Sequence, residues 1–209
     1  MKNIFFFLLV GFSFKGMTQT IIPIQNYFDY NHSDNVYFKD VNNIFDKFLG
    51  TWEYTDGSHY FKITFYKQEQ TQMGKTSDGR VIYKKVQYSD RIYSQFIYKL
   101  YGVTIYDTYP PGGLNPTPYK SDIDGERDVV ENSNKLNLSY QEPSTTGCSR
   151  NKMGILEVEF QHVGQNTDQL IWTRTDRNIG LPPYPCPTGT TPDTSEYQIP
   201  ANMVLTKIN

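Results

Sequence analysis

The chain has 209 residues, of which 20 are Lys or Arg and 22 are Asp or Glu, so its formal net charge is -2. This balance argues against a nucleic-acid partner, because charge-driven binding to phosphates needs clustered Lys and Arg. The length fits one domain with a sizeable hydrophobic core. Aromatic residues make up 15% of the sequence, with 17 Tyr and 13 Phe, a composition typical of strands that pack their rings on one face.

The first 18 residues are typical of an export signal. A basic start at Met1–Asn3 precedes an apolar run from Ile4 to Phe14. As a helix this run would span roughly 17 Å, well short of the roughly 30 Å of a bilayer core. We therefore predict a signal peptide over residues 1–18 and a secreted or periplasmic protein that is not membrane-spanning. The alternative is a buried N-terminal helix in a cytosolic fold.

The chain contains two cysteines, Cys148 and Cys186, each in a stretch rich in turn-forming residues. In an exported protein a pair of cysteines predicts a disulfide bond. Such a bond would contribute on the order of 4 kcal/mol in the chain-entropy description. The alternative is a reactive thiol, but no His or basic cluster lies nearby in the sequence to lower its pKa.

Residues 19–39 show no sustained period and predict an extended lead-in, with an edge strand near residues 36–38, to a single domain over residues 40–209. Apolar residues then recur at helical spacing after Asp40, which stands in the N-cap position. These residues are Val41, Ile44, Phe45 and Phe48. We predict a short helix from Asp40 to Phe48; the alternative is an irregular loop that buries the two Phe.

After Gly50 the apolar pattern changes to a period of two, which predicts strands. The first two strands form a hairpin with its turn at Asp56–Ser58, and Ser89–Asp90 is expected to form a later turn. Further strands are predicted at residues 80–88, 91–101, 103–108, around 123, 135–140, 155–162, 169–175 and 203–208. Two loops rich in Pro and Gly, at residues 109–118 and 181–192, cannot be helices or central strands.

The expected fold class is therefore all-β, an antiparallel meander of about nine strands with one short N-terminal helix. Closure into a barrel fits the meander best, because it removes the open edges that Tyr-rich strands would otherwise expose. A two-sheet sandwich is the alternative.

The tripeptide Gly50-Thr51-Trp52, between the helix-like run and the first hairpin, resembles the Gly-x-Trp signature at the first strand of lipocalins and lipocalin-like barrels. The order of the predicted elements is also similar to that of small secreted lipocalin-like proteins of Gram-negative bacteria, many without an assigned function. The resemblance implies that Trp52 packs at the closed end of a barrel against an Arg from a late strand. Arg174 stands where that residue is expected, so Gly50, Trp52 and Arg174 are assigned structural roles.

No catalytic motif, metal signature or nucleotide-binding loop stands out, and we expect no enzyme activity, no metal and no cofactor. Residues 120–131 partly match a calcium loop, but Lys120 occupies the position of the first carboxylate ligand, which favours a solvated hairpin instead. Glu157 and Glu159 lie two residues apart on a predicted strand and are interpreted as a solvent-facing pair rather than a catalytic one.

Aromatic and aliphatic residues on the strand faces provide candidates for a ligand pocket, although the same side chains could fill the interior completely. The candidate ligand-binding residues are Tyr54, Phe61, Ile63, Phe65, Phe96, Tyr98 and Trp172. We predict a secreted or periplasmic binding protein for a small apolar or amphipathic ligand. The alternative is a structural or interaction protein of the bacterial envelope, whose Tyr- and Pro-rich loops contact a protein or glycan partner.

Overall fold

The structure, a computed structural model, describes residues 19–30, 35–73, 86–110, 123–125, 134–144, 146–148, 150–165, 167–178 and 186–208. The predicted signal peptide lies outside the described residues. Within them the chain is all-β, as expected, with eleven strands and two short 3₁₀ turns. The strands are β1 (Thr20–Pro23), β2 (Val36–Lys39), β3 (Gly50–Thr55), β4 (His59–Gln72), β5 (Gln87–Leu100), β6 (Val103–Asp107), β7 (Ile123–Gly125), β8 (Lys135–Tyr140), β9 (Lys152–Val163), β10 (Thr167–Asn178) and β11 (Asn202–Ile208).

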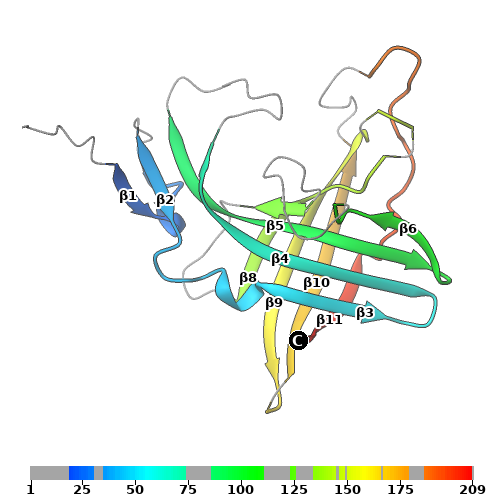
Figure 1. Cartoon of the computed structure of the whole chain (residues 1–209), viewed down its shortest axis with the longest axis horizontal. Coiled ribbons are helices and arrows are strands. Elements are labelled where there is room, and N and C mark those ends of the chain that lie inside the picture. Colours follow the sequence, from blue (N-terminus) through cyan, green and yellow to red (C-terminus); the bar gives the residue numbers. More distant parts are fainter. Residues whose placement is uncertain are drawn as a thin grey trace, which may run out of the picture.

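All eleven strands belong to one hydrogen-bonded sheet rather than to two separate sheets. The main path runs β1-β2-β5-β4-β3-β11-β10-β9-β8-β7, and β6 pairs with β5. The pairings β1–β2 and β2–β5 are parallel and the others are antiparallel. The sheet bends so strongly that β3 to β5 cross over β9 to β11, with the core between the two halves (Figure 1).

The lipocalin-like barrel is not confirmed. Among the described residues, the two halves of the bent sheet meet again at β7, which pairs with β8 on one side. On its other side this three-residue strand is joined to β5 by two residue pairs and not by a full ladder. The architecture is therefore a sharply bent sheet in which the short end strand β7 touches β5, the third strand from the other end.

Most of the strands lie where the period-two pattern predicts them. The first hairpin is confirmed as β3 and β4, and the carboxylate of Asp56 closes its turn by accepting hydrogen bonds from the backbone N–H groups of Ser58 and His59. The turn expected at Ser89–Asp90 is wrong, because both residues lie inside β5 and are fully buried. Residues 80–85 of the next predicted strand lie outside the described residues.

The helix predicted from Asp40 to Phe48 is also wrong, and the irregular loop is confirmed. Asp40 does act as a cap, accepting hydrogen bonds from the backbone N–H groups of Ile44 at 2.7 Å and Phe45 at 3.2 Å. However, Asn43 has a φ of +52°, which interrupts any helix, and the regular part is the 3₁₀ turn η2 (Asp46–Phe48). This path buries both Phe and leaves Val41 exposed.

Aromatic rings from both halves of the sheet form the core. Phe61 of β4 meets Trp172 of β10 edge to face, with ring centres 5.3 Å apart. Phe160 of β9 meets Phe48 and Trp52 in the same way at 6.5 and 6.4 Å. Each such pair adds to the stability already gained from burial of the rings, so the crossing of the two halves is fixed by specific contacts.

Gly50, Trp52 and Lys207 form one structural unit at the start of β3. Trp52 is fully buried, and its Nε1 donates to the backbone oxygen of Phe48 over 2.8 Å. Gly50 has a φ of +106°, which residues with a side chain rarely adopt, and a Cβ there would lie 3.2 Å from Cε of Lys207. Glycine therefore leaves room for Lys207, whose Nζ lies 5.1 Å from the centre of a Trp52 ring.

The stacking of Arg174 on Trp52 that the resemblance implies is not found. The Arg174 guanidinium lies instead over the rings of Tyr140 and Tyr197, at 4.6 and 4.9 Å. The reason is the strand order: β11 lies between β3 and β10, and Lys207 is the direct cross-strand partner of Trp52. A cation does cover the indole, but a different strand supplies it.

A buried carboxylate, Asp90, fastens the parallel N-terminal strands to the rest of the sheet. It accepts hydrogen bonds from the Tyr37 hydroxyl of β2, from the backbone N–H of Asp40 at 2.9 Å and from that of Gln70 at 3.1 Å. Gln70 has a φ of +52° and lies in the β-bulge of β4, which turns its N–H toward this acceptor. Burial, reinforced by the bond to Asp90, raises the pKa of Tyr37 well above its ordinary value, so the hydroxyl remains a donor.

Replacing Trp52 by Ala should lower the free energy of unfolding by about 3 to 5 kcal/mol, because it removes a large side chain from a packed core. Trp52→Phe should cost less, because a ring still fills the core. It should still lower the stability to some extent, because the hydrogen bond to Phe48 is lost. Chemical denaturation followed by circular dichroism measures both values. Wild-type stability in the Ala variant would contradict the structural role of the indole.

Replacing Asp90 by Ala should lower the free energy of unfolding by about 2 to 4 kcal/mol, because three buried donors lose their acceptor. Asp29→Ala, which removes an exposed carboxylate from the same part of the chain, is the matched control and should change stability by less than about 0.5 kcal/mol. Equal midpoints of urea denaturation for the two variants would show that Asp90 does not anchor these strands.

Candidate functional site

Most of the residues predicted to bind ligand fill the core. Six of the seven are at most 2% exposed and belong to one continuous cluster: Phe61, Ile63, Phe65, Phe96, Tyr98 and Trp172. Tyr54 is half-buried. These six side chains therefore form the packed interior that the sequence analysis gave as the alternative. They do not line an open internal cup.

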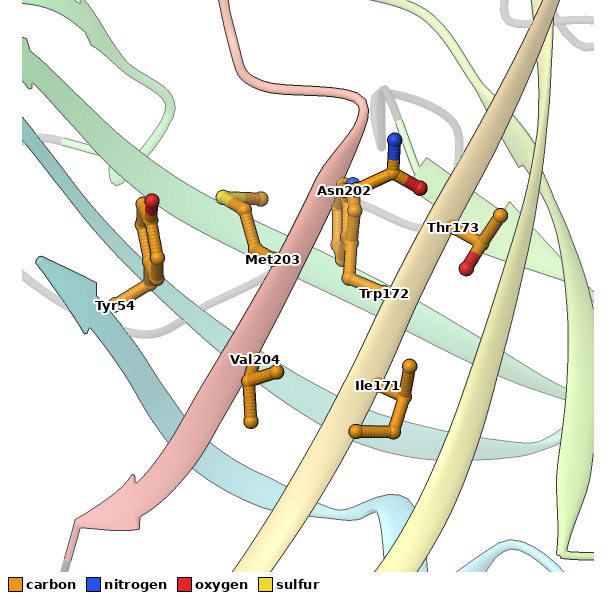
Figure 2. Close-up of a pocket in the computed structure, with 7 residues that line it drawn as sticks. All are labelled: Tyr54, Ile171, Trp172, Thr173, Asn202, Met203 and Val204. Carbon is orange, nitrogen blue, oxygen red and sulfur yellow. The ribbon is translucent and has the colours of Figure 1, made fainter. Parts of the chain in front are cut away.

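A hollow of about 340 Å³ nevertheless lies beside this core at the surface. Its wall comes from the end of β3 and from the facing parts of β10 and β11, and it includes two of the predicted residues, Tyr54 and Trp172. The other lining residues are Ile171, Thr173, Asn202, Met203 and Val204. Figure 2 shows the side chains of Tyr54, Met203 and Trp172 extending in the same direction from three neighbouring strands.

The hollow exists because β3 and β11 separate before their ends. Their ladder contains three residue pairs, from Thr51–Ile208 to Glu53–Thr206. Beyond Glu53, Tyr54 continues to pair with β4, and Val204 and Met203 continue to pair with β10. The two strands thus keep their outer partners while the seam between them opens, and the space is lined by exposed Val204 as well as buried Met203 and Trp172.

Trp172 borders the hollow, but its side chain is packed into the core. Its ring is fixed edge to face by Phe61 at 5.3 Å and by Tyr140 at 5.8 Å, and the residue is fully buried. Its Nε1 is buried and has no hydrogen-bond partner within the described part of the structure. The other tryptophan, Trp52, donates to Phe48, so the two indoles differ in this respect.

The hollow is neutral. Among its lining residues Tyr54 is the one that titrates, and its pKa is raised because burial and a hydrogen bond to Asp56 disfavour the phenolate. The remaining polar groups of the lining are the Thr173 hydroxyl and the Asn202 amide. A charged ligand group would therefore lose its hydration without meeting an opposite charge.

Residues 186–201, which we call the closing segment, lead into β11 and determine where the hollow lies. The disulfide Cys148–Cys186, as predicted, ties the start of this segment to the stretch before β9, and Arg150 forms an isolated parallel bridge with Asp193. The Arg150 guanidinium, which is fully buried, donates to the Ser195 backbone oxygen at 2.9 Å and its Oγ at 2.6 Å. The disulfide is consistent with an extracytoplasmic location.

Glu142 and Arg174 hold the end of the closing segment. Glu142, 1% exposed, accepts hydrogen bonds from the backbone N–H groups of Gln198 at 2.8 Å and Ile199 at 2.9 Å. Arg174 donates to the Ile199 oxygen at 2.7 Å, and its backbone N–H donates to the oxygen of Ala201 at 2.8 Å. The chain is thereby fixed immediately before Asn202, Met203 and Val204 line the hollow.

The other candidate chemistry of the sequence does not assemble into a site. Within the described ranges, no three His, Cys, Asp or Glu side chains gather as metal ligands. Glu157 and Glu159 face outward and pair with Lys135 at 2.7 and 3.4 Å, as the solvent-facing interpretation predicts. Most of the partial calcium loop lies outside the described residues, as do residues 111–118 and 181–185 of the two Pro-rich loops.

Sequence reasoning missed five of the seven lining residues, although it placed four of these five on strands; Asn202 precedes the strand predicted at residues 203–208. The missed residues are Ile171, Thr173, Asn202, Met203 and Val204. Ile171 and Val204 are apolar residues on the outward face of their strands, a weak signal of a binding surface. The opening itself depends on where the β3–β11 ladder stops, which no local pattern encodes.

The chain matches a family of unknown function, DUF6705, over residues 1–208, and it belongs to that family. No curated protein and no solved structure matches the chain. None of the helices in the described ranges has the length and apolar character needed to cross a membrane.

The buried tyrosines beside the closing segment should make the protein sensitive to alkali. Burial, together with the charge of Glu142, raises the pKa of Tyr98 and Tyr106 to about 12. In the unfolded chain these groups ionise near their ordinary value of 10.0. Their neutral form therefore stabilises the fold fully below pH 10, and this contribution should be lost as the pH rises from 10 through 12.

Chemical denaturation at a series of pH values measures this loss. Tyr98→Phe should make the fall of stability between pH 10 and 12 shallower, because one buried ionisable group is gone. Tyr101→Phe, at a position 79% exposed, is the control and should leave the slope unchanged. The same slope in all three proteins would contradict the assignment.

Proposed function

We propose that the protein is a non-catalytic, exported binding protein for a small apolar or amphipathic ligand, which it takes up in the hollow between β3 and β11. The observation that carries this proposal is the mainly apolar hollow at the seam where β3 and β11 separate. Its volume of about 340 Å³ lies at the lower end of the range typical of small-molecule pockets.

The composition of the lining supports an apolar or amphipathic ligand. Ile171 and Val204 give aliphatic contacts, while Thr173 and Asn202 place neutral polar groups in the wall. Burying the apolar part of a ligand here would gain roughly 25 cal/mol for each Å² removed from water. Export is supported by the disulfide and by the signal-like residues 1–18.

In this proposal the fold is a variant of the lipocalin-like barrel. Support comes from the buried Gly-x-Trp unit at the start of β3, with a cation over the indole, and from the contact between β7 and β5. The variant differs in its entry: the ligand approaches through a seam in the wall of the bent sheet, because the interior is occupied by aromatic side chains.

The alternative function, contact with a protein or glycan partner of the envelope, rests on the loops at residues 109–118 and 181–192. Tyr109 is half-buried and its hydroxyl bonds to Thr64, and residues 186–192 belong to the closing segment. These described parts of the loops serve the fold, so the hollow is the better supported site.

A charged residue at the lip of the hollow should abolish ligand uptake without unfolding the protein. Val204→Glu places a carboxylate among the lining residues. It should weaken binding of the neutral fluorescent probe N-phenyl-1-naphthylamine at least tenfold, because the bound probe would take water away from the carboxylate without offering it a partner. Fluorescence titration of the purified mature protein measures this affinity.

Val163→Glu is the matched control, because Val163 is 45% exposed and Val204 is 47% exposed. It lies at the far end of β9 and should leave the affinity unchanged. Equal affinities in both variants would mean that the probe binds elsewhere.

Native mass spectrometry of protein purified from its source should in addition detect a co-purified small molecule. A protein that carries no such molecule and binds no probe would refute the proposal.

A further inference from the structure

The register of the ladders shows which way the backbone of β11 faces beside the hollow. Successive residues of an antiparallel strand direct their N–H and C=O groups to alternate sides. The backbone N–H of Arg174 donates to the oxygen of Ala201 over 2.8 Å, so Ala201 faces β10, and Met203, two residues later, faces β10 as well. Val204 therefore directs both its N–H and its C=O away from β10 and toward β3.

In the described part of the structure, the backbone of Val204 has no partner residue on β3. Thr206 also faces β3 and pairs there with Glu53, which is the last pair of the ladder. The next pair in this register would join Val204 to Thr55, but the two strands have separated at that point. One main-chain donor and one main-chain acceptor thus face the seam at Val204, which is 47% exposed and lines the hollow.

An unpaired N–H and C=O on the same side of one residue form a short open strand edge, and such an edge binds another extended backbone. In the matching antiparallel arrangement, one residue exchanges both hydrogen bonds with the single residue opposite it. The ligand group that fits is therefore an amino acid unit with its own N–H and C=O. A ketone or an ether satisfies only one of the two groups of Val204.

The surroundings of Val204 select the side chain and the ends of this unit. The Val204 side chain points to the outer face of the sheet, beside its cross-strand partner Ile171, whereas the adjacent Met203 is buried. A residue bonded to Val204 directs its own side chain to the same face and against Val204, which favours an aliphatic side chain. The lining contains no Lys, Arg, His, Asp or Glu, so both ends of the unit should be uncharged.

We infer that the ligand of the hollow contains an extended, N-acylated amino acid unit with an aliphatic side chain, which exchanges two backbone hydrogen bonds with Val204. The inference rests on the proposed function, because it names the chemistry that the same hollow recognises. Such a unit occurs in a small N-acyl amino acid amide and in one strand of a longer apolar peptide. Probes of both lengths distinguish these two sources.

Hydrogen exchange of the ligand-free mature protein tests the open edge. The amide hydrogens of Met203 and Leu205, which face β10, should exchange slowly. The amide hydrogen of Val204 should exchange at least about tenfold faster, because it lacks an acceptor. Val204→Thr identifies the signal as the valine that disappears from the ¹H–¹⁵N spectrum. Equal protection of all three amides would overturn the inference.

Binding of a matched pair of probes tests the two hydrogen bonds. N-acetyl-valine methylamide should protect the Val204 amide from exchange and move its ¹H signal downfield. The ester analogue, in which an oxygen replaces the valine N–H, has nearly the same shape and should bind about tenfold more weakly, because one donor is missing.

A seven-residue apolar peptide with blocked ends and valine at its centre is the longer probe. Protection of the Val204 amide by N-acetyl-valine methylamide assigns the ligand to the small molecules of the proposed function. Protection by the peptide alone keeps the inference and replaces the small ligand by a strand of a protein chain.

Val204→Pro removes the N–H that faces the seam and leaves the ladder to β10, whose bonds come from Met203 and Leu205. This variant should bind the amide and ester probes equally, whereas Val204→Thr, which keeps the N–H and nearly the same shape, should retain the preference. The two probes measured on the wild-type protein give the same test if the Pro variant does not fold.

The outcomes separate the inference from the proposed function. If the wild-type protein binds amide and ester equally well while N-phenyl-1-naphthylamine still binds at the hollow, the inference fails and the proposed function stands. If neither the two probes, the peptide nor N-phenyl-1-naphthylamine perturbs the backbone signals of Met203 and Val204, both are overturned.

Discussion

The buried charge cluster around Glu142 is the constraint on which the C-terminal half of the structure depends. Its carboxylate accepts the backbone N–H groups of Gln198 and Ile199, and it lies 3.6 Å from the guanidinium of Arg174. Buried charges are tolerated when they are paired and hydrogen-bonded, and each partner here has several bonds. Loss of one partner would leave the others charged and unsatisfied, so this cluster fixes the path of the closing segment more strictly than apolar packing could.

The position of the hollow follows from that constraint. Because Arg174 holds Ile199 and Ala201, β11 starts beside β10 and reaches β3 only at Thr206. On the other side, β3 is held by β4 along its whole length. Two well-anchored strands therefore leave an open seam between them, and the hollow lies at this seam.

Much of the fold could be predicted from the sequence, because each strand with one buried face shows the period-two pattern locally. Strand β8 lies where that pattern places it, and the Asp56 turn has the residue types that its hydrogen bonds require. The predictions that failed depend on distant parts of the chain. The apolar residues after Asp40 do recur at helical spacing, but the positive φ of Asn43 prevents a helix. Their side chains therefore reach the core from a loop. Ser89 and Asp90 look like a turn, yet Asp90 is a buried anchor for β2 and the β4 bulge.

The sequence by itself determined the all-β class, the location of most strands, the disulfide and the buried role of Trp52, because these follow from local alternation, from the number of cysteines and from a short motif. Only the tertiary structure decided which cation covers Trp52, which candidate residues fill the core, and where the sheet opens. Those outcomes depend on strand order and on the residue at which a ladder stops. Pairing between strands far apart in the chain sets both, and no single segment contains that information.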